Sequence, residues 1–482
     1  MDTATFQRAR LIPITGIKGD QEQERRATSA LLAVLEAVPE FARTFLKPLG
    51  APAGKVQSFI EPAFVQADAK VRPDGLIVVE RGATKWSVAI EVKTNKNNLV
   101  ADQLNSYLDV CRDNSIDALL TISNEVLTLS GTHPTTGIDN RKLKKIKLHH
   151  FSWIRVLTEA QIQKDHRGVS DPDQAWILGE LIRYLESPSS GALEFTDMGD
   201  SWVTVRQAVT NGTLSPTDGG AVAIVNRFES LLRYVSFKLS ARLGADVTPV
   251  VGKSAKEEPQ KHMKAAVNEL VTKSHLKGAL KVQNTVAPLE LLVDLRASQI
   301  LSSVTVEAPR EGRPLTKVNW LLRQLKSSPP GTRIETRVKR VSQPVAACLL
   351  SEAMEHPEKL LPTDSREISN FTITLISSMG VKRGDGSNSF VSSFVNAIDS
   401  AYLGLLQNLQ SWTPKAPKMP IAPVLISSDQ ESSIGIREHG SILSNEADDN
   451  SPPNFGTTNN PSARLRGEAD EPDIEEGASE VS

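Results

Sequence analysis

The sequence predicts a mixed α/β fold for its N-terminal third, followed by a second α+β region and a polar tail. Three observations support this prediction. Residues 20–46 place apolar side chains at spacings of three and four, as an amphipathic helix does. Residues 56–93 contain strand-like stretches. Residues 98–112 return to helical spacing before a short apolar run at 116–122, which is typical of a buried strand.

Composition excludes several classes of protein. The chain has 482 residues, 39% of them hydrophobic and 23% charged, which is ordinary for a globular protein of two or three domains. Its net charge of -2 means that any nucleic-acid binding needs a local basic patch. The two cysteines, Cys111 and Cys348, exclude a disulfide framework and are not in a metal-binding spacing.

The chain shows no sign of export or of membrane insertion. Its first ten residues, MDTATFQRAR, lack the apolar segment of a signal peptide. No stretch of 18 apolar residues is present, so we expect no membrane span. These features lead us to expect a cytoplasmic protein.

The first predicted helix has recognisable ends. Asp20 is a plausible N-cap, and Gln23 stands where a capping box requires it. Pro39 is expected to kink or end the helix, and Pro48 and Gly50 to close the helical stretch.

The remaining elements follow in order. Strands are expected at 56–65 (interrupted near Pro62), 75–80, 86–93, 116–122 and 145–153, and helices at 98–112 and 174–185. Residues 20–186 therefore read as one domain with the order helix, three strands, helix, strand. The serine- and proline-containing stretch at 186–191 marks its end.

Residues 193–412 are predicted to form a second, accessory α+β domain of unknown role. A βαβ-like section stands out in it. The expected helices are 222–243, 262–272, 316–326 and 389–409, and the expected strands are 291–295, 303–307 and 333–338. Residues 413–482 are rich in proline, serine and acidic side chains, and we predict that they form a disordered tail.

A hairpin brings two carboxylates together. On the strand at 86–93, Glu91 and Lys93 share one face, because side chains alternate along a strand. If the chain turns about Gly82 and Ala83, opposed positions have numbers that sum to 165, so Asp74 faces Glu91. Opposed residues have Cβ atoms roughly 4.5–5.5 Å apart. Such carboxylates repel, and a divalent cation such as Mg²⁺ between them relieves the repulsion.

This stretch resembles the PD-(D/E)XK nuclease superfamily, also called restriction-endonuclease-like. Pro73 and Asp74 match the PD element, and residues 91–93 match the ExK element. Gln103 and Tyr107 match the Q-x₃-Y element of the RecB-like members. The predicted order of elements in residues 20–160 matches the αβββαβ core of that family. Glu-Val-Lys alone is a weak motif, whose ordinary interpretation is an ion pair at a strand end. The joint pattern is much more specific.

The resemblance implies a separate role for each of these residues at a metal site. Asp74 and Glu91, with the carbonyl oxygen of Val92, would hold Mg²⁺ or Mn²⁺. The metal would polarise the scissile phosphate and lower the pKa of a bound water. Lys93 would orient that water or offset charge that develops on the phosphate.

The resemblance also implies roles for residues on two helices. Gln103 and Tyr107 would position the backbone of the substrate. Their i, i+4 spacing equally suits a helix face that packs against the sheet. Many members of the family add a glutamate from the first helix, for which Glu24 is our candidate and Glu22 and Glu36 are rivals.

We therefore expect a Mg²⁺-dependent nuclease that hydrolyses phosphodiester bonds, with DNA as the substrate by analogy with the family. A role in defence, repair or stress response would fit. One alternative is an inactive protein that keeps this fold to bind nucleic acid or a protein. Another is a scaffold whose main role lies in residues 193–412, through which a homodimer or a protein partner would bind.

Overall fold

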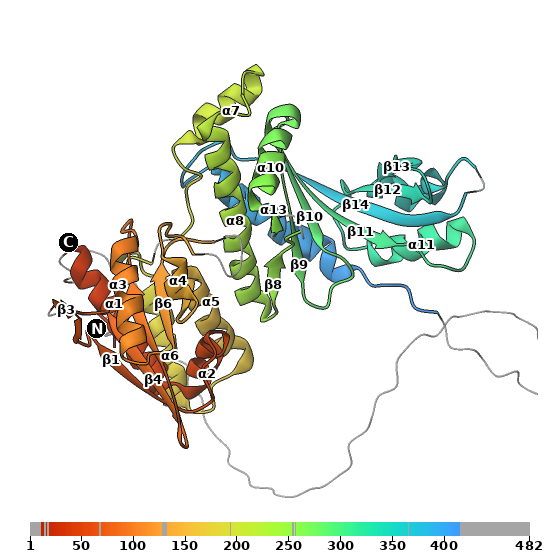
Figure 1. Ribbon diagram of the computed structural model, residues 1–482. Coiled ribbons are helices and arrows are strands. Elements are labelled where there is room, and N and C mark those ends of the chain that lie inside the picture. The colour runs from red at the N-terminus through yellow and green to blue at the C-terminus, as the bar shows by residue number, and fades with distance from the viewer. Residues whose placement is uncertain are drawn as a thin grey trace, which may run out of the picture. The chain divides into compact units, whose positions relative to one another are not determined.

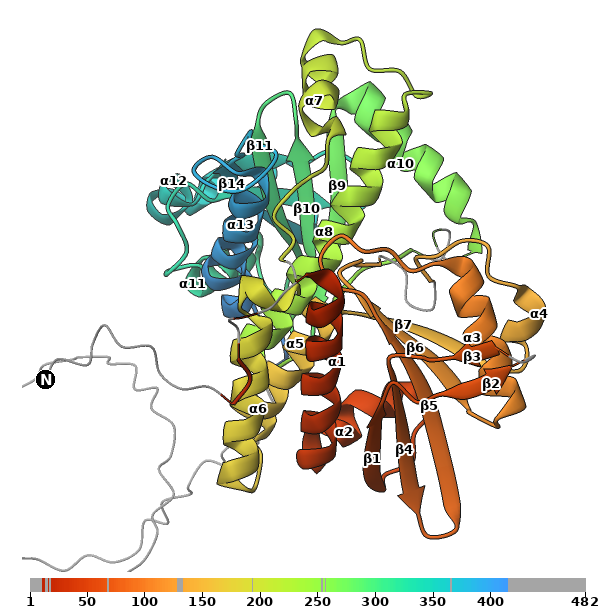
Figure 2. The ribbon, with the colours of Figure 1, turned by 90° about the vertical axis from the view of Figure 1, so that its left-hand side faces the viewer.

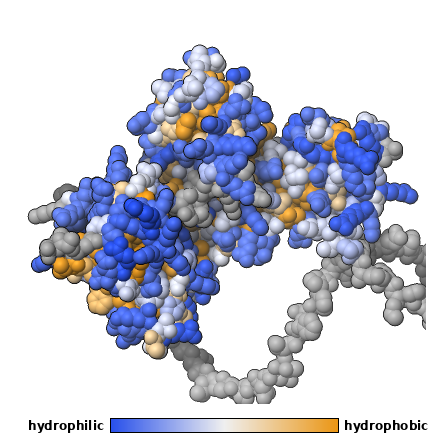
Figure 3. All heavy atoms as spheres, in the orientation of Figure 1, coloured by the Kyte–Doolittle hydropathy of each residue, from blue (hydrophilic) through white to orange (hydrophobic). Residues whose placement is uncertain are grey.

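The computed structural model describes residues 11–414, with gaps at 14–15, 17–18, 67–68, 128–132, 193, 253–254, 256 and 365 (Figure 1). Beyond Pro414, the predicted disordered tail lies outside the described residues. No helix in the described part of the chain is long and apolar enough to cross a membrane. The face in Figure 3 is mostly hydrophilic, with smaller apolar patches among the polar residues.

The N-terminal part is built on a mixed five-stranded sheet. In spatial order its strands are β1 (Lys55–Ile60), β4 (Gly75–Arg81), β5 (Thr84–Val92), β6 (Ala118–Ser123) and β7 (Lys147–Ser152). The first three form an antiparallel meander, whereas β6 and β7 run parallel to β5. A small separate ladder pairs β2 (Phe64–Gln66) with β3 (Ala69–Val71). The predicted mixed α/β class is confirmed.

Helices cover both faces of this sheet (Figure 2). One face packs against α1 (Asp20–Ala37), α2 (Pro39–Leu46), α5 (Trp153–Ile162) and α6 (Pro172–Leu185). The other face packs against α3 (Ala101–Asp113), beside which lies the short α4 (Asn140–Leu143). The alternation of side chains along β5 therefore separates two apolar cores, and Glu91 projects toward the α3 side with Ala89.

The first helix ends as predicted but does not begin as predicted. Pro39 starts α2, and Val38 divides it from α1 with φ -120° and ψ 87°. Gly19, with φ 82°, precedes the first turn, and no side chain caps α1, so the capping prediction was wrong. The side chain of Gln23 instead donates from Nε2 to the carbonyl oxygen of Ser189, 2.7 Å away. A tertiary contact has displaced the local one.

The helical stretch closes at its predicted residues. A 3₁₀ turn, Lys47–Leu49, follows α2 and contains Pro48. Gly50 then adopts φ 96°, a left-handed conformation that glycine reaches without a steric penalty.

The strand predicted at 145–153 stops one residue early, because a helix that the sequence did not predict begins at Trp153. Ser152 ends β7 and caps α5, with its Oγ accepting from the backbone N–H of Arg155 at 3.4 Å. The change from strand to helix therefore takes place at one residue.

The second part is built on a seven-stranded antiparallel sheet. In spatial order its strands are β13 (Ala346–Leu349), β12 (Arg333–Val338), β14 (Ile368–Ser378), β11 (Gln299–Glu307), β10 (Leu289–Asp294), β9 (His275–Val282) and β8 (Val247–Pro249). Its helices are α7 (Ser201–Asn211), α8 (Gly219–Leu243), α10 (Pro259–Lys273), α11 (Pro314–Gln324), α12 (Leu350–Glu355) and α13 (Phe390–Gly404).

The βαβ-like section that the sequence predicts is split in the structure. Strands β11 and β12 both pair antiparallel with β14, so they run parallel to each other with β14 between them. Sequence patterns missed β14, although Phe371 and Ile373 alternate with threonines along it. Its other face carries hydroxyl pairs, such as Thr374 with Ser303 at 2.9 Å. Strands β8, β9 and β13 were also missed.

The described residues, within 11–414, belong to one compact unit that holds both sheets. The sheets have separate apolar cores, and the second core begins at Phe195. The proposed domain bounds of 20–186 and 193–412 stay a prediction. Helices α5 and α8 pack together within the unit, and the hydroxyl of Thr158 donates to the carbonyl oxygen of Phe237 at 3.4 Å.

Candidate active site

The predicted hairpin register is confirmed. Strands β4 and β5 pair Glu80 with Lys85 and Gly75 with Ile90, so paired numbers sum to 165. Asp74 is the residue before β4 and continues this register toward Glu91. Its Oδ2 accepts a hydrogen bond from the backbone N–H of Val92 at 2.7 Å. The carboxylate of Asp74 therefore lies at the carboxyl end of β5.

The glycine after Asp74 lets a helix approach this end of the hairpin. A Cβ atom at Gly75 would lie 2.6 Å from Cδ1 of Leu32, a residue of α1. A larger residue would displace the end of the Leu32 side chain. Gly75 therefore allows α1 to pack closely on the start of β4.

Glu91 is a buried carboxylate that contacts the ammonium group of Lys93. It has no exposed surface, and no backbone N–H or hydroxyl group of the described residues donates to its oxygens with hydrogen-bond geometry. Nζ of Lys93 lies 2.8 Å from its Oε1 as an ion pair. Burial and then the charge of Asp74 raise the pKa of Glu91 to about 8. Burial also raises the pKa of Asp74, against the hydrogen bond from the Val92 N–H.

Lys93 links the hairpin to the first helix. Its Nζ also lies 3.4 Å from Oε2 of Glu24, and the two side chains are 15% and 14% exposed. Burial lowers the pKa of Lys93, but the carboxylates of Glu91, Asp74 and Glu24 outweigh it, so the pKa is raised overall. The side chain is therefore a protonated ammonium group at neutral pH.

The structure brings one of the three candidate glutamates to the site. Oε1 of Glu24 accepts a hydrogen bond from Nδ2 of Asn97 at 2.7 Å, a contact that the sequence did not indicate. The other two candidates bind elsewhere. Glu22 pairs with Arg26 at 2.7 Å, and Glu36 accepts from the hydroxyl of Ser58 at 2.7 Å.

Gln103 and Tyr107 face the hairpin from α3. Nε2 of Gln103 donates to the hydroxyl of Tyr107 at 2.8 Å, and that hydroxyl donates to the carbonyl oxygen of Arg72 at 3.0 Å. Burial, followed by the charge of Glu91, raises the pKa of the Tyr107 hydroxyl. In this arrangement the pair holds the backbone immediately before Pro73 and Asp74. The predicted contact with substrate remains untested.

A hydrogen-bonded cluster lies beside Glu91 on the same face of the sheet. Thr121 pairs with Glu91 between β5 and β6, and His150 pairs with Thr121 between β6 and β7, so the three side chains share one face. Oγ1 of Thr121 lies 2.9 Å from Nε2 of His133 and 3.0 Å from Nδ1 of His150. The sequence showed no signal for this cluster, because His133 comes from a loop.

Both histidines of this cluster are held neutral. Nδ1 of His133 accepts from the Thr135 N–H at 3.1 Å, and Nε2 of His150 lies 3.1 Å from the carbonyl oxygen of Glu125. These partners assign a proton to Nε2 of each ring. Burial lowers the pKa of both histidines to about 4.

The donor set fits a hard divalent cation. Among the described residues, no group of three or more His, Cys, Asp or Glu side chains is arranged to hold a metal ion. Mg²⁺ needs fewer, because it binds one or two carboxylates and keeps several waters. Asp74, Glu91 and the Val92 carbonyl are such a set. The observation that favours a cation there is the burial of the Glu91 carboxylate beside the like charge of Asp74.

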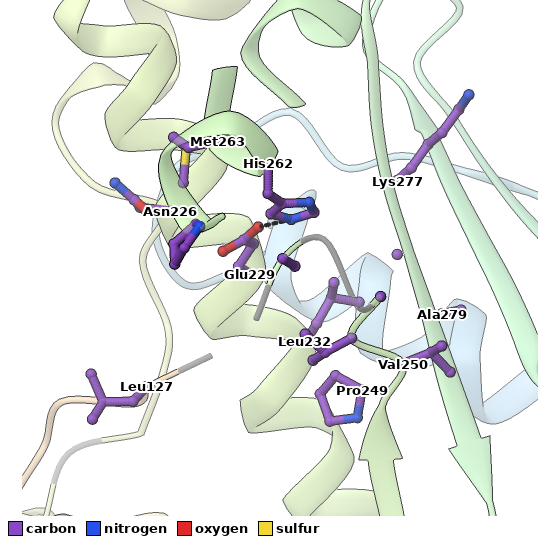
Figure 4. Close-up of a pocket in the computed structure, with 15 residues that line it drawn as sticks. Leu127, Asn226, Glu229, Leu232, Pro249, Val250, His262, Met263, Lys277 and Ala279 are labelled. Atoms are coloured by element: carbon purple, nitrogen blue, oxygen red, sulfur yellow. Dashed lines mark hydrogen bonds and ion pairs between the residues drawn. The ribbon is translucent and has the colours of Figure 1, made fainter. Parts of the chain in front are cut away.

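A separate cavity of about 270 Å³ lies in the second part, lined by residues of α8, α10 and β9 (Figure 4). In it, Nε2 of His262 lies 3.0 Å from Oε1 of Glu229 (Figure 4). Leu232, Val250 and Met263 form an apolar part of the wall. None of the predicted site residues is among the described residues that line it.

No protein-family model matches this chain, and no curated protein or solved structure matches it at a significant level. The nuclease interpretation therefore depends on the residues and their geometry alone.

Proposed function

We propose that this protein is a metal-dependent nuclease that hydrolyses phosphodiester bonds, with DNA as its substrate. The observation that carries the proposal is the buried carboxylate of Glu91, which lies beside the carboxylate of Asp74 and 2.8 Å from the ammonium group of Lys93. Perturbed carboxyl groups of this kind gather at functional sites. The order of α1, β1, β4, β5, α3 and β6 supports an αβββαβ core of the restriction-endonuclease-like type.

In this proposal Asp74, Glu91 and the carbonyl oxygen of Val92 hold Mg²⁺ or Mn²⁺. When bound, the metal supplies polarisation of the scissile phosphate and a lower pKa for a bound water. The chain's own groups prepare the site. The Val92 N–H fixes the rotamer of Asp74, and the tyrosine on α3 fixes the backbone before it.

Lys93 acts as a cation in the proposed reaction. Because the neighbouring carboxylates raise its pKa, Lys93 keeps its proton and cannot serve as a general base at neutral pH. Its ammonium group is suited to orienting a water or offsetting negative charge on the phosphate. Glu24 and Glu91 hold it from two sides.

A cleavage assay on single- and double-stranded DNA and RNA, with Mg²⁺, Mn²⁺ or EDTA, tests the proposal. The wild type is compared with Glu91→Gln and Lys93→Met, and Glu36→Gln serves as a control on the same helix as Glu24. We expect metal-dependent cleavage by the wild type and the control, and its loss in the other two. Equal activity in all four proteins would refute the assignment. Metal binding without any cleavage would favour the inactive binding protein.

A further inference from the structure

Two arginines meet where α5 packs against α8. The contact between Thr158 and Phe237 joins these helices. Arg155 lies about one turn before Thr158, and Arg233 lies about one turn before Phe237, so the two arginines extend from the same stretch of the helix contact. Burial lowers the pKa of Arg155, and the charge of Glu159 opposes this shift whereas that of Arg233 adds to it. The two guanidinium groups therefore act on each other.

Both guanidinium groups rest on aromatic rings. Cζ of Arg155 lies 3.6 Å from the centroid of the Phe151 ring, and Cζ of Arg233 lies 4.6 Å from that of Phe237. Within the described part of the chain, neither side chain forms an ion pair or a hydrogen bond. Aromatic faces hold a guanidinium in place but leave its charge and its five N–H donors available.

A third polar group of the same region lacks a partner. Nε2 of His149 is buried and has no hydrogen-bond partner among the described residues. Burial, and then the charges of Lys147 and Arg155, lower the pKa of His149. Buried polar atoms are rarely left unsatisfied, and an oxyanion would accept hydrogen bonds from all three groups.

The N-terminus of α5 lies at the edge of the sheet that also holds the carboxylates, and the cluster faces the α5 side of the sheet, opposite to Glu91. Strands β5, β6 and β7 are parallel, so their carboxyl ends meet at one edge, where α5 begins. The indole N–H of Trp153, the first residue of α5, donates to the carbonyl oxygen of Lys93 at 3.0 Å. A polynucleotide that reaches Lys93 would pass over this edge, from one face of the sheet to the other, to come to Arg155.

We propose that Arg155, Arg233 and His149 bind a phosphate of the polynucleotide backbone, at a distance from the phosphate that is cut. This inference rests on the proposed nuclease function and adds how the substrate is held. Guanidinium groups suit phosphate because their paired N–H donors match its oxygens. The N-terminus of α5 adds a favourable partial charge.

The test is a titration of a fluorescein-labelled DNA oligonucleotide in EDTA, followed by anisotropy at several salt concentrations. We expect Arg155→Gln and Arg233→Gln each to weaken binding about 10-fold, as the loss of a charged hydrogen bond does. The salt dependence should become shallower by about 0.7–0.9 in logarithmic slope for each phosphate that the variant no longer neutralises. Arg81→Gln removes an exposed arginine from the far end of the β4–β5 hairpin and should change neither value.

Thermal unfolding separates binding from folding. If Arg155→Gln does not fold, the binding measurements are made with Arg155→Lys and Arg233→Gln. The Arg155→Lys variant should lose only part of its affinity for the oligonucleotide. Wild-type affinity in a folded double Arg→Gln variant would overturn the proposal. So would stabilisation of the wild type by inorganic phosphate without affinity for the oligonucleotide, because the ligand would then be a free phosphate compound.

The titration is independent of cleavage, because EDTA removes the metal. A wild type that binds the oligonucleotide through these arginines but cuts no substrate would refute the nuclease proposal and support the phosphate site. If cleavage depends on Glu91 but binding of the oligonucleotide is unchanged in both arginine variants, the nuclease proposal is supported and the phosphate site is refuted.

Discussion

The two sheets of this protein bury charge in opposite ways. Beside the second sheet, the side chain of Lys317 is 4% exposed, and its Nζ lies 3.0 Å from Glu367, whose carboxylate remains half exposed to water. At the first sheet, Glu91 is buried between the ammonium group of Lys93 and a second carboxylate, that of Asp74. A buried charge with a hydrated partner is compatible with a structural role. A buried carboxylate that also faces a like charge favours a cationic ligand.

The largest effect that follows from this contrast is on catalysis. Glu91→Gln keeps the shape of the side chain but removes its charge, so we expect metal-dependent cleavage to fall by about 100-fold or more. The free energy of unfolding should change little at neutral pH without metal, because a glutamine amide and a protonated carboxyl group are both neutral and have the same shape. Cleavage rates and urea denaturation check the two halves of this prediction. A loss of activity explained by unfolding would contradict it.

Substitution of Glu24 should reduce the cleavage rate less than substitution of Glu91, because Glu24 acts through Lys93. Glu24→Gln weakens a charged contact, and we expect cleavage to fall about 10-fold. Glu22→Gln serves as the matched control, because Glu22 lies on the same helix and pairs with Arg26. Equal rates for the two variants, measured at saturating Mg²⁺, would remove Glu24 from the site.

Tyr107→Phe, beside the first sheet, should lower the free energy of unfolding more than Thr374→Val in the second sheet. The first change leaves the carbonyl of Arg72 without its buried donor, and we expect a loss of about 1–2 kcal/mol. The second removes a hydroxyl pair with the partly exposed Ser303 and should cost less. Denaturation of both variants measures the difference. A larger loss of unfolding free energy in Thr374→Val than in Tyr107→Phe would contradict this prediction.

The smallest effect belongs to the second sheet. Lys317→Met replaces a buried ammonium with an apolar side chain of similar length and leaves Glu367 in contact with water. We expect an unfolding free energy within about 1 kcal/mol of the wild type and unchanged cleavage. Loss of cleavage in a folded Lys317→Met protein would show that the second sheet takes part in the reaction.

The hairpin register could be predicted from the sequence because it depends on local rules. Side-chain alternation and a turn at Gly82 are enough to place Asp74 opposite Glu91, and β4 and β5 pair in that register. Glu24 could not be separated from Glu22 and Glu36 in this way. The face of α1 that packs in the apolar core is set by the tertiary fold, and it decides which glutamate reaches Lys93.

The features that sequence patterns missed depend on distant contacts. Gln23 suits a capping box, but its amide bonds to Ser189, far along the chain. The cluster around Thr121 joins a loop histidine to one on β7, and no spacing in the sequence relates them. The apolar alternation of β14 is visible, yet its position between β11 and β12 is set by the tertiary fold.

The central claim is that Glu91 is a buried carboxylate suited to a cation, and the pH dependence of stability tests it most directly. In EDTA, the pKa of Glu91 in the folded protein is about 8, so the group keeps its proton up to that pH, whereas the unfolded chain releases the proton near the ordinary glutamate pKa of 4.5. Stability contributed by this group is therefore complete below about pH 4.5 and is lost as pH rises toward 8.

The quantity to measure is the free energy of unfolding of the wild type minus that of Glu91→Gln, from pH 4.5 to 8, with and without Mg²⁺. We predict that this difference falls with rising pH in EDTA, and that Mg²⁺ restores it at pH 8 but not at pH 4.5. A difference that stays flat with pH, and that Mg²⁺ does not change, would contradict the account.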